Sequence, residues 1–204
     1  MHQYFVTGIG TEVGKTVCSA ILVKALKANY WKPVQAGDLH DTDTMKVARW
    51  TGQQPTDTAI HSEGYRLKTP MSPHAAAAID GVSVSVKDFT LPATNRPLIV
   101  EGAGGLLVPL NEEETILDLM AHLQLPAILV SRNYLGSINH TLLSIAQLQQ
   151  RNIPIAGIIF NGESVPSTES IITQMSGLPV ILRVPELSEV SLVTIEKMAK
   201  MVVL

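Results

Sequence analysis

Residues 4–16 read YFVTGIGTEVGKT, and this stretch decides the fold. Tyr4–Thr7 is a short apolar run typical of a buried strand, and the glycines after it lead into a helix expected over Lys15–Asn29. Backbone N–H groups in such a turn converge on phosphate oxygens, and the helix N-terminus adds positive potential. Lys15 supplies a point charge for the β- and γ-phosphates, and Thr16 supplies a hydroxyl ligand for Mg²⁺. The stretch therefore predicts a nucleotide-binding phosphate loop.

The spacing inside this loop is irregular, because five residues rather than four separate Gly8 from Gly14. The alternative is an ordinary glycine turn that only caps a helix. The intact Gly-Lys-Thr and its position directly after a strand favour the phosphate loop.

Strand and helix patterns alternate through the rest of the chain. Apolar runs that favour strands lie at Trp31–Val34, Leu98–Glu101, Ala127–Val130, Ile155–Phe160 and Val180–Arg183. Helical patterns lie at Asp43–Thr51, Thr115–Leu123, Ile138–Gln150, Ser167–Met175 and Ser191–Val202. Residues 52–94 are irregular, with one short helix expected near Pro73–Ile79. This alternation predicts one α/β domain over residues 1–204, P-loop NTPase-like, with a mainly parallel sheet and helices on both faces.

Composition excludes several classes of protein. Of the 204 residues, 46% are hydrophobic and 16% charged, which rules out a disordered chain. A net charge of −3 provides no basic field for nucleic acid, and no apolar run is long enough to span a membrane. The single cysteine, Cys18, suits a reducing compartment, and the first residues lack the features of a secretory signal. We therefore expect a cytoplasmic protein that binds neither nucleic acid nor membrane.

Two acidic residues and one lysine are candidates for work beside the phosphates. Glu101 ends an apolar strand, so it should reach the carboxyl edge of the sheet where ligands bind; a helix cap is the alternative. Asp43 begins a helix after the second strand, although Asp38 and Asp41 compete with it on spacing. Lys32 lies at the end of that strand, where it could stabilise a transferring phosphoryl group or merely protect a sheet edge.

Other candidates lie at the ends of later segments. Asn161 ends a strand, where its amide could read a purine edge or simply start a turn. Pro185 follows the last strand and could line the nucleotide or terminate a loop. Residues 135–140 open a helix whose N–H groups could hold a carboxylate, with capping by Ser137 as the alternative.

These pieces together resemble the dethiobiotin synthetase family, and the resemblance covers nearly the whole chain. It rests, besides the helix start at Asp43, on six stretches: YFVTGIGTEVGKTV (4–17), KPVQAG (32–37), TPMSPHAAA (69–77), VEGAGGLLVPL (100–110), LPAILVSRNYLGSINH (125–140) and GIIFNG (157–162). Members of this family use ATP and CO₂ to convert 7,8-diaminopelargonic acid into dethiobiotin, by way of a carbamate and its mixed anhydride with phosphate.

The resemblance implies a role for each matching residue. Lys15 and Lys32 would be catalytic, and Thr16, Asp43 and Glu101 would hold Mg²⁺. The remaining implied contacts are with ATP, by Glu12, Val13, Gly14, Lys15, Thr16, Val17, Asp43, Glu101, Gly102, Ala103, Gly104, Asn161 and Pro185, and with the substrate, by Thr11, Lys32, Ala36 and Asn139. A homodimer with shared active sites is also implied, in which Asn139 binds the substrate carboxylate across the interface.

One residue departs from the family pattern. Ala36 stands where the family usually has Ser or Thr, so a hydroxyl contact with the substrate is lost, and Gln35, Asp38 or a water would have to replace it. Two other functions remain open: an ATPase of the deviant-Walker type that acts through partners, and an amidoligase-like protein. The first commonly has a second lysine early in the loop, which is absent here, and the second needs a glutaminase domain for which the chain has no room.

Overall fold

The computed structural model describes residues 2–54 and 58–204, and its centre is a parallel sheet. Seven strands pair in the order β4-β2-β6-β1-β7-β8-β9, and all neighbouring strands in this sheet run parallel. The strands are β1 (Gln3–Gly8), β2 (Asn29–Trp31), β4 (Ile60–His61), β6 (Leu98–Gly105), β7 (Ala127–Arg132), β8 (Ile155–Asn161) and β9 (Val180–Val184). A separate pair joins β3 (Val34–Ala36) to β5 (Tyr65–Leu67). The predicted α/β architecture is confirmed.

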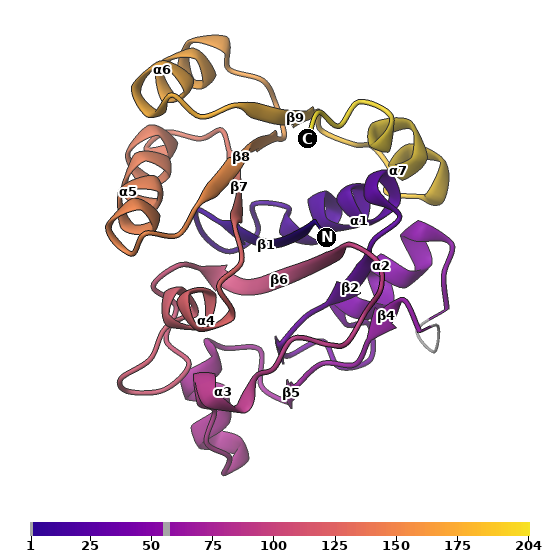
Figure 1. Ribbon diagram of the computed structural model, residues 1–204, viewed down its shortest axis with the longest axis vertical. Helices are drawn as coiled ribbons and strands as arrows, with labels where there is room; N and C mark the ends of the chain where they lie inside the picture. The colour runs from indigo at the N-terminus through magenta and orange to yellow at the C-terminus, as the bar shows by residue number, and fades with distance from the viewer. Residues whose placement is uncertain (1, 55–57) are drawn as a thin grey trace.

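Helices cover both faces of the sheet (Figure 1). One face carries α1 (Lys15–Leu26), α2 (Asp43–Thr51) and α7 (Leu192–Ala199), whose apolar residues share a core with the strands. The other face carries α4 (Ile116–Leu123), α5 (Ser137–Gln150) and α6 (Pro166–Ser176). The helix α3 (Pro73–Asp80) packs beside β3 and β5. Because both faces are covered, the strands are almost continuously apolar.

The expected strand at Trp31–Val34 is wrong, because its residues belong to two strands in two different sheets. β2 ends at Trp31, and β3 begins at Val34, with Lys32 and Pro33 between them. Proline has no N–H to donate to a ladder, which explains the break. Lys32 therefore lies in the two-residue connection between β2 and β3 rather than inside a strand.

Three other expectations need correction. The first helix ends at Leu26 instead of Asn29, because Lys27 adopts a left-handed conformation with φ 50°. The last helix ends at Ala199 instead of Val202. The irregular stretch contains, besides the expected helix, the very short strands β4 and β5, which have too few residues to show a periodic pattern. In the described part of the chain, no helix is long and apolar enough to cross a bilayer.

Candidate active site

The phosphate loop connects β1 to α1, and its backbone conformation requires glycine. Gly14 has φ 89°, and a Cβ there would lie 2.1 Å from Asn161 Nδ2. The same amide nitrogen donates to the carbonyl of Val13 at 2.9 Å. Lys15 Nζ donates to the carbonyl of Gly10 at 2.9 Å, so its ammonium reaches back over the loop. The loop therefore encloses a space lined by backbone N–H groups and one buried lysine, which is suited to phosphate.

The strand β6 runs alongside this loop and brings Glu101 to its base. Gly102–Gly105 continue the strand, and Gly105 pairs with Gly8. Gly104 has φ 67°, and a side chain there would collide with Val108. The strand β6 can therefore pass close to the loop only with small residues, and the predicted Gly102, Ala103 and Gly104 are small.

The predicted Lys32, Asp43, Glu101 and Thr16 meet in one cluster, in which Lys32 and Glu101 are buried and Asp43 and Thr16 are half-buried. Lys32 Nζ lies 2.6 Å from Asp43 Oδ2 and 3.1 Å from Glu101 Oε1. Thr16 Oγ1 donates to the same Glu101 oxygen at 3.0 Å. Only 4% of Lys32 and 1% of Glu101 is exposed, so the charges are out of solvent. A buried lysine is stable here because two carboxylates compensate its charge.

The pKa values of the two lysines shift in opposite directions. Burial lowers the pKa of Lys15 to about 8, with the Glu101 carboxylate opposing and the Lys32 charge reinforcing that effect. Burial also lowers the pKa of Lys32, but Glu101 and Asp43 outweigh it and the net pKa is raised. For Asp43, burial is outweighed by the charge and hydrogen bond of Lys32, so its pKa is lowered. The two carboxylates thus stabilise the charge of Lys32, whereas burial outweighs the opposing effect of Glu101 at Lys15.

The helix α2 positions Asp43 through its capping and through Gln35. Thr42 Oγ1 caps the helix by accepting from the N–H of Met45 at 3.2 Å. Gln35 accepts from the N–H of Asp43 at 3.2 Å and donates to the carbonyl of Gly37 at 3.0 Å. The oxygen and the nitrogen of the Gln35 amide are therefore both hydrogen-bonded to this loop. Gln35 is thus poorly placed to replace the hydroxyl that is missing at Ala36. Asp38 is exposed on the same loop.

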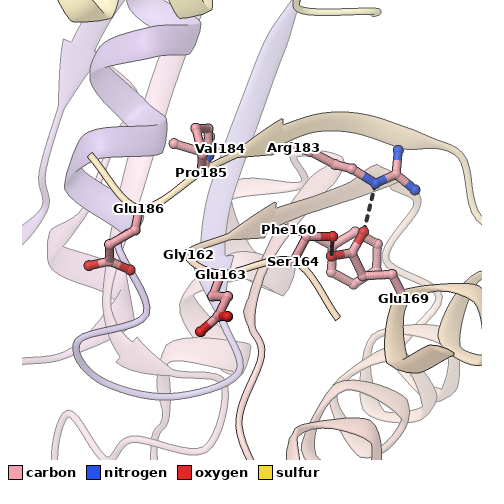
Figure 2. Close-up of a pocket in the computed structure, with 9 residues that line it drawn as sticks. All are labelled: Phe160, Gly162, Glu163, Ser164, Glu169, Arg183, Val184, Pro185 and Glu186. Atoms are coloured by element: carbon pink, nitrogen blue, oxygen red, sulfur yellow. Dashed lines mark hydrogen bonds and ion pairs between the residues drawn. The ribbon is translucent and has the colours of Figure 1, made fainter. Parts of the chain in front are cut away.

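The residues Asn161 and Pro185 lie on the other side of the phosphate loop, at the ends of β8 and β9. A cavity of about 570 Å³ lies at the ends of β8 and β9, and its lining includes Pro185 but not Asn161 (Figure 2). It is lined by Phe160, Gly162, Glu163, Ser164, Glu169, Arg183, Val184, Pro185 and Glu186. Asn161 uses its amide N–H on Val13, so it supports the loop, while its Oδ1 makes no hydrogen bond among the described residues.

A second groove, of about 400 Å³, lies between the phosphate loop, the residues after β6, and α5. Thr11, Leu106 and Leu143 line it. Asn139 is absent from this lining and is exposed on the first turn of α5, near the exposed Leu135 and Ile138. Among the described residues of one chain, Asn139 is not a hydrogen-bond or ion-pair partner of Lys15 or Lys32. Gly136, rather than Ser137, is the N-cap of α5.

Three residues of the loop and of α1 that were expected to contact ATP differ in how far they are buried. Glu12 is exposed and adopts φ 58°. Val13 is buried, and its Cγ2 would lie only 2.6 Å from a Cβ on Gly8. Val17 is half-buried and packs on the core beneath α1. Burial raises the pKa of Cys18, in the same helix, well above its usual range, which fits its expected role as a small apolar residue.

Sequence reasoning missed Tyr30, whose hydroxyl donates to Glu101 Oε2 at 3.0 Å. A tyrosine in a buried strand is usually a core residue, so the pattern contains no signal for this contact. It also missed that Gln35 holds Asp43, since only the fold brings the two residues together.

Comparison with known proteins places this geometry in a family. A family model described as an AAA domain matches residues 2–194. The chain is 53% identical to the ATP-dependent dethiobiotin synthetase BioD of Christiangramia forsetii, over 90% of this chain and 87% of that protein. It is 50% identical to the protein of the same name from Afipia carboxidovorans, with the same coverage.

Solved structures show a similar fold at low sequence identity. A ParA family ATPase from Chlorobium tepidum matches with TM-score 0.58 at 13% identity, covering 97% of this chain and 96% of that one. The MinC:MinD complex of Aquifex aeolicus contains a chain that matches with TM-score 0.54 at 12% identity, covering 97% and 86%. These likenesses concern the fold alone, so they lend no support to a partner-regulated ATPase. On the strength of its sequence relatives, the chain belongs to the ATP-dependent dethiobiotin synthetase family.

Proposed function

We propose that residues 1–204 form one ATP-binding ligase domain that makes dethiobiotin from 7,8-diaminopelargonic acid, CO₂ and ATP. Relatives named ATP-dependent dethiobiotin synthetase, about half identical over 90% of the chain, support this activity. The observation that carries it is the buried cluster in which Lys32 lies between Asp43 and Glu101, one hydrogen bond from Thr16 of the phosphate loop. This cluster combines a fixed cation with oxygen ligands beside a phosphate site.

The reaction proceeds in three steps that this chain's residues assist. One amine of the substrate bonds to the carbon of CO₂ and loses a proton, which gives a carbamate. A carbamate oxygen attacks the γ-phosphorus, and the bond to ADP breaks. The second amine then attacks the carbamate carbon and loses a proton, and phosphate leaves as the ring closes. Carbamate and phosphoryl group are both anionic, so Lys15 and Lys32 hold them together in a site of low dielectric.

The chemistry of the donors fits Mg²⁺. Thr16, Asp43 and Glu101 offer a hydroxyl and two carboxylates, the hard oxygen ligands that Mg²⁺ prefers. In residues 2–54 and 58–204, no three His, Cys, Asp or Glu side chains gather to hold a metal by themselves. This also fits Mg²⁺, which usually takes one or two carboxylates and completes its shell with phosphate oxygens and water. When bound, Mg²⁺ supplies positive charge to the phosphates of ATP.

The two hollows beside the phosphate loop suit the two larger substrates. The cavity lined by Pro185 and Gly162 would take the base of ATP, and Asn161, which precedes Gly162 in the chain, would also contact the base. The groove between Thr11 and α5 has an apolar wall, with Leu106 and Leu143, that suits the hydrocarbon chain of the diamine. Lys32 and Ala36 would lie towards its amines.

A homodimer would complete the substrate site. The first turn of α5 exposes Asn139 together with Tyr134, Leu135 and Ile138, a mixed apolar and polar surface suited to a second copy. Across such an interface, Asn139 of one chain would bind the substrate carboxylate in the other. The cytoplasmic location stays a prediction.

The experiment that tests this function measures ADP release with and without its substrates. We expect ADP formation to require 7,8-diaminopelargonic acid and bicarbonate together, with dethiobiotin detected by mass in equal amount. ADP formation that is indifferent to the diamine would contradict the proposal and favour a partner-regulated ATPase.

A further inference from the structure

Tyr30 occupies the middle of β2 and faces the same side of the sheet as Glu101. Tyr30 pairs in register with Ile99 of β6, and the two residues share one core cluster. Side chains alternate between faces along a strand, so Glu101, two residues beyond Ile99, faces the same way. The phenol ring is fully buried, with 0% exposed. Its hydroxyl is thereby directed along the sheet towards the carboxyl ends of the strands.

The hydroxyl completes the hydrogen bonding of the Glu101 carboxylate. Oε1 accepts from Thr16 at 3.0 Å and from Lys32 at 3.1 Å, while Oε2 accepts from Tyr30 at 3.0 Å. Among the described residues, Tyr30 is the one donor to Oε2, and Glu101 is the one partner of the Tyr30 hydroxyl. A carboxylate oxygen can only accept, so the Tyr30 hydroxyl is the donor in this bond.

Packing alone does not require this hydroxyl. The ring lies in an apolar cluster that a phenylalanine would fill equally well, whereas a buried hydroxyl without a partner would be unfavourable. The bond matters to the carboxylate for the same reason, since a buried charged oxygen left unpaired is costly. Without Tyr30, Glu101 could rotate to share Lys32 between its two oxygens, and Oε1 would lose its fixed direction.

We propose that Tyr30 is a positioning residue, which acts through Glu101 to hold Oε1 towards Thr16 and Lys32 and so keeps the carboxylate aligned for Mg²⁺. This inference rests on the proposed function, because it takes Glu101 as a ligand of the metal that accompanies ATP. Among the described residues, the Tyr30 hydroxyl forms no hydrogen bond with Lys15 or with the phosphate loop. The prediction is therefore selective: the metal-dependent part of nucleotide binding depends on Tyr30, and the metal-free part does not.

The test compares Tyr30→Phe with wild type by calorimetric titration of ADP, first in EDTA and then over a series of Mg²⁺ concentrations. We expect the Kd for ADP in EDTA to change less than twofold, because the loop is intact. The Mg²⁺ concentration that gives half of the metal-induced gain in affinity should rise about tenfold, as for a lost hydrogen bond to a charged group. In turnover assays, the same variant should raise the half-saturating Mg²⁺ concentration more than it lowers kcat.

Tyr65→Phe is the matched control. Its hydroxyl also donates to a carboxylate, that of Asp88 at 2.7 Å, but this pair lies outside the site. The control should leave the Mg²⁺ dependence as in wild type. A second test is a double-mutant cycle: because Tyr30 acts through Glu101, Tyr30→Phe should have no further effect on Mg²⁺ dependence in a Glu101→Gln background.

Four results would overturn the inference, and they have different meanings. If wild type gains no affinity for ADP from Mg²⁺, the proposed metal site fails and the role of Tyr30 fails with it. If wild type gains affinity and Tyr30→Phe gains it at the same Mg²⁺ concentration, the role of Tyr30 alone fails. Equal weakening with EDTA and with Mg²⁺, or an undiminished effect in Glu101→Gln, would show that Tyr30 merely supports the fold.

Discussion

Replacement of Lys32 is the most informative perturbation of the site, because alanine and arginine separate charge from geometry. Lys32→Ala removes a cation that lies 2.6 Å from Asp43 and 3.1 Å from Glu101. Lys32→Arg keeps the charge and can still neutralise both carboxylates. Its planar fork, however, cannot reproduce the compact contact of an ammonium group with a carbamate and a phosphoryl group.

The structure gives a magnitude for each variant. Removing one partner from a buried ion pair costs about 3–5 kcal/mol, which for a chain of this size lowers Tm by about 6–20 °C. Lys32→Ala should therefore be less stable as well as inactive, since it leaves two buried carboxylates without their cation. Turnover should fall about 10³-fold or more, which corresponds to about 4 kcal/mol of transition-state stabilisation. Lys32→Arg should keep most of its stability and still lose most of its turnover.

The assay measures ADP release at saturating diamine, bicarbonate and MgATP, with thermal unfolding followed on the same samples. Lys24→Ala is a suitable control, because the half-buried Lys24 forms an ion pair with Glu196 on α7 and lies far along α1 from the phosphate loop. This control should behave as wild type in turnover. If Lys32→Arg turned over at close to the wild-type rate, Lys32 would be only a counter-ion, and its catalytic role would have to be abandoned.

Further predictions concern the loop and the interface. Lys15→Ala should lose about 10³-fold in turnover; near-normal activity would contradict the assignment. Because the pKa of Lys15 is lowered to about 8 from 10.5, the unfolded chain holds the extra proton between these pH values, so stability of the ligand-free protein should rise with pH there by about 3 kcal/mol. Thermal unfolding of Lys15→Met should lack that rise; an identical profile would refute the shift. Gly14→Ala should abolish ADP binding in calorimetry, since its Cβ would collide with Asn161; tight binding would exclude that clash. Mixing inactive Lys15→Ala and Asn139→Ala chains should restore some turnover; none after proven subunit exchange would count against shared sites.

Most of the sheet could be predicted because its strands are apolar and bounded by turn residues. Leu98–Glu101 and Ala127–Val130 fall inside the observed strands β6 and β7. The strand β6 continues further, through glycines that no periodic pattern assigns to a strand. At Trp31–Val34 the predicted strand was too long instead. The pattern suggested one strand across Lys32-Pro33, although the chain leaves the seven-stranded sheet there and enters the two-stranded one. Local pattern thus locates strands but not the partner with which each one pairs.

The site was predictable to the extent that its residues lie at strand ends or in the loop. Lys15 and Thr16 satisfy that rule, which follows from the geometry of parallel sheets. Glu101 ends only the apolar part of its strand, because β6 continues to Gly105. Tyr30 does not, because it lies in mid-strand and reaches Glu101 only through the pairing of β2 with β6. Gln35 is similar, since its bond to the N–H of Asp43 crosses a loop whose path the sequence does not specify.

The cluster around Glu101 behaves as one unit, and this follows from burial. A lysine that is 4% exposed is tolerated only with carboxylates against it, and a glutamate that is 1% exposed is tolerated only with donors on both oxygens. Lys32, Asp43 and Glu101 therefore stabilise one another, and Tyr30 and Thr16 complete the arrangement. Substitutions within it should be non-additive by about 0.5–3 kcal/mol, because each removes a partner on which the others depend. The break at Pro33 matters for the same reason: by ending β2, it leaves Lys32 between two sheets, where both carboxylates can reach it.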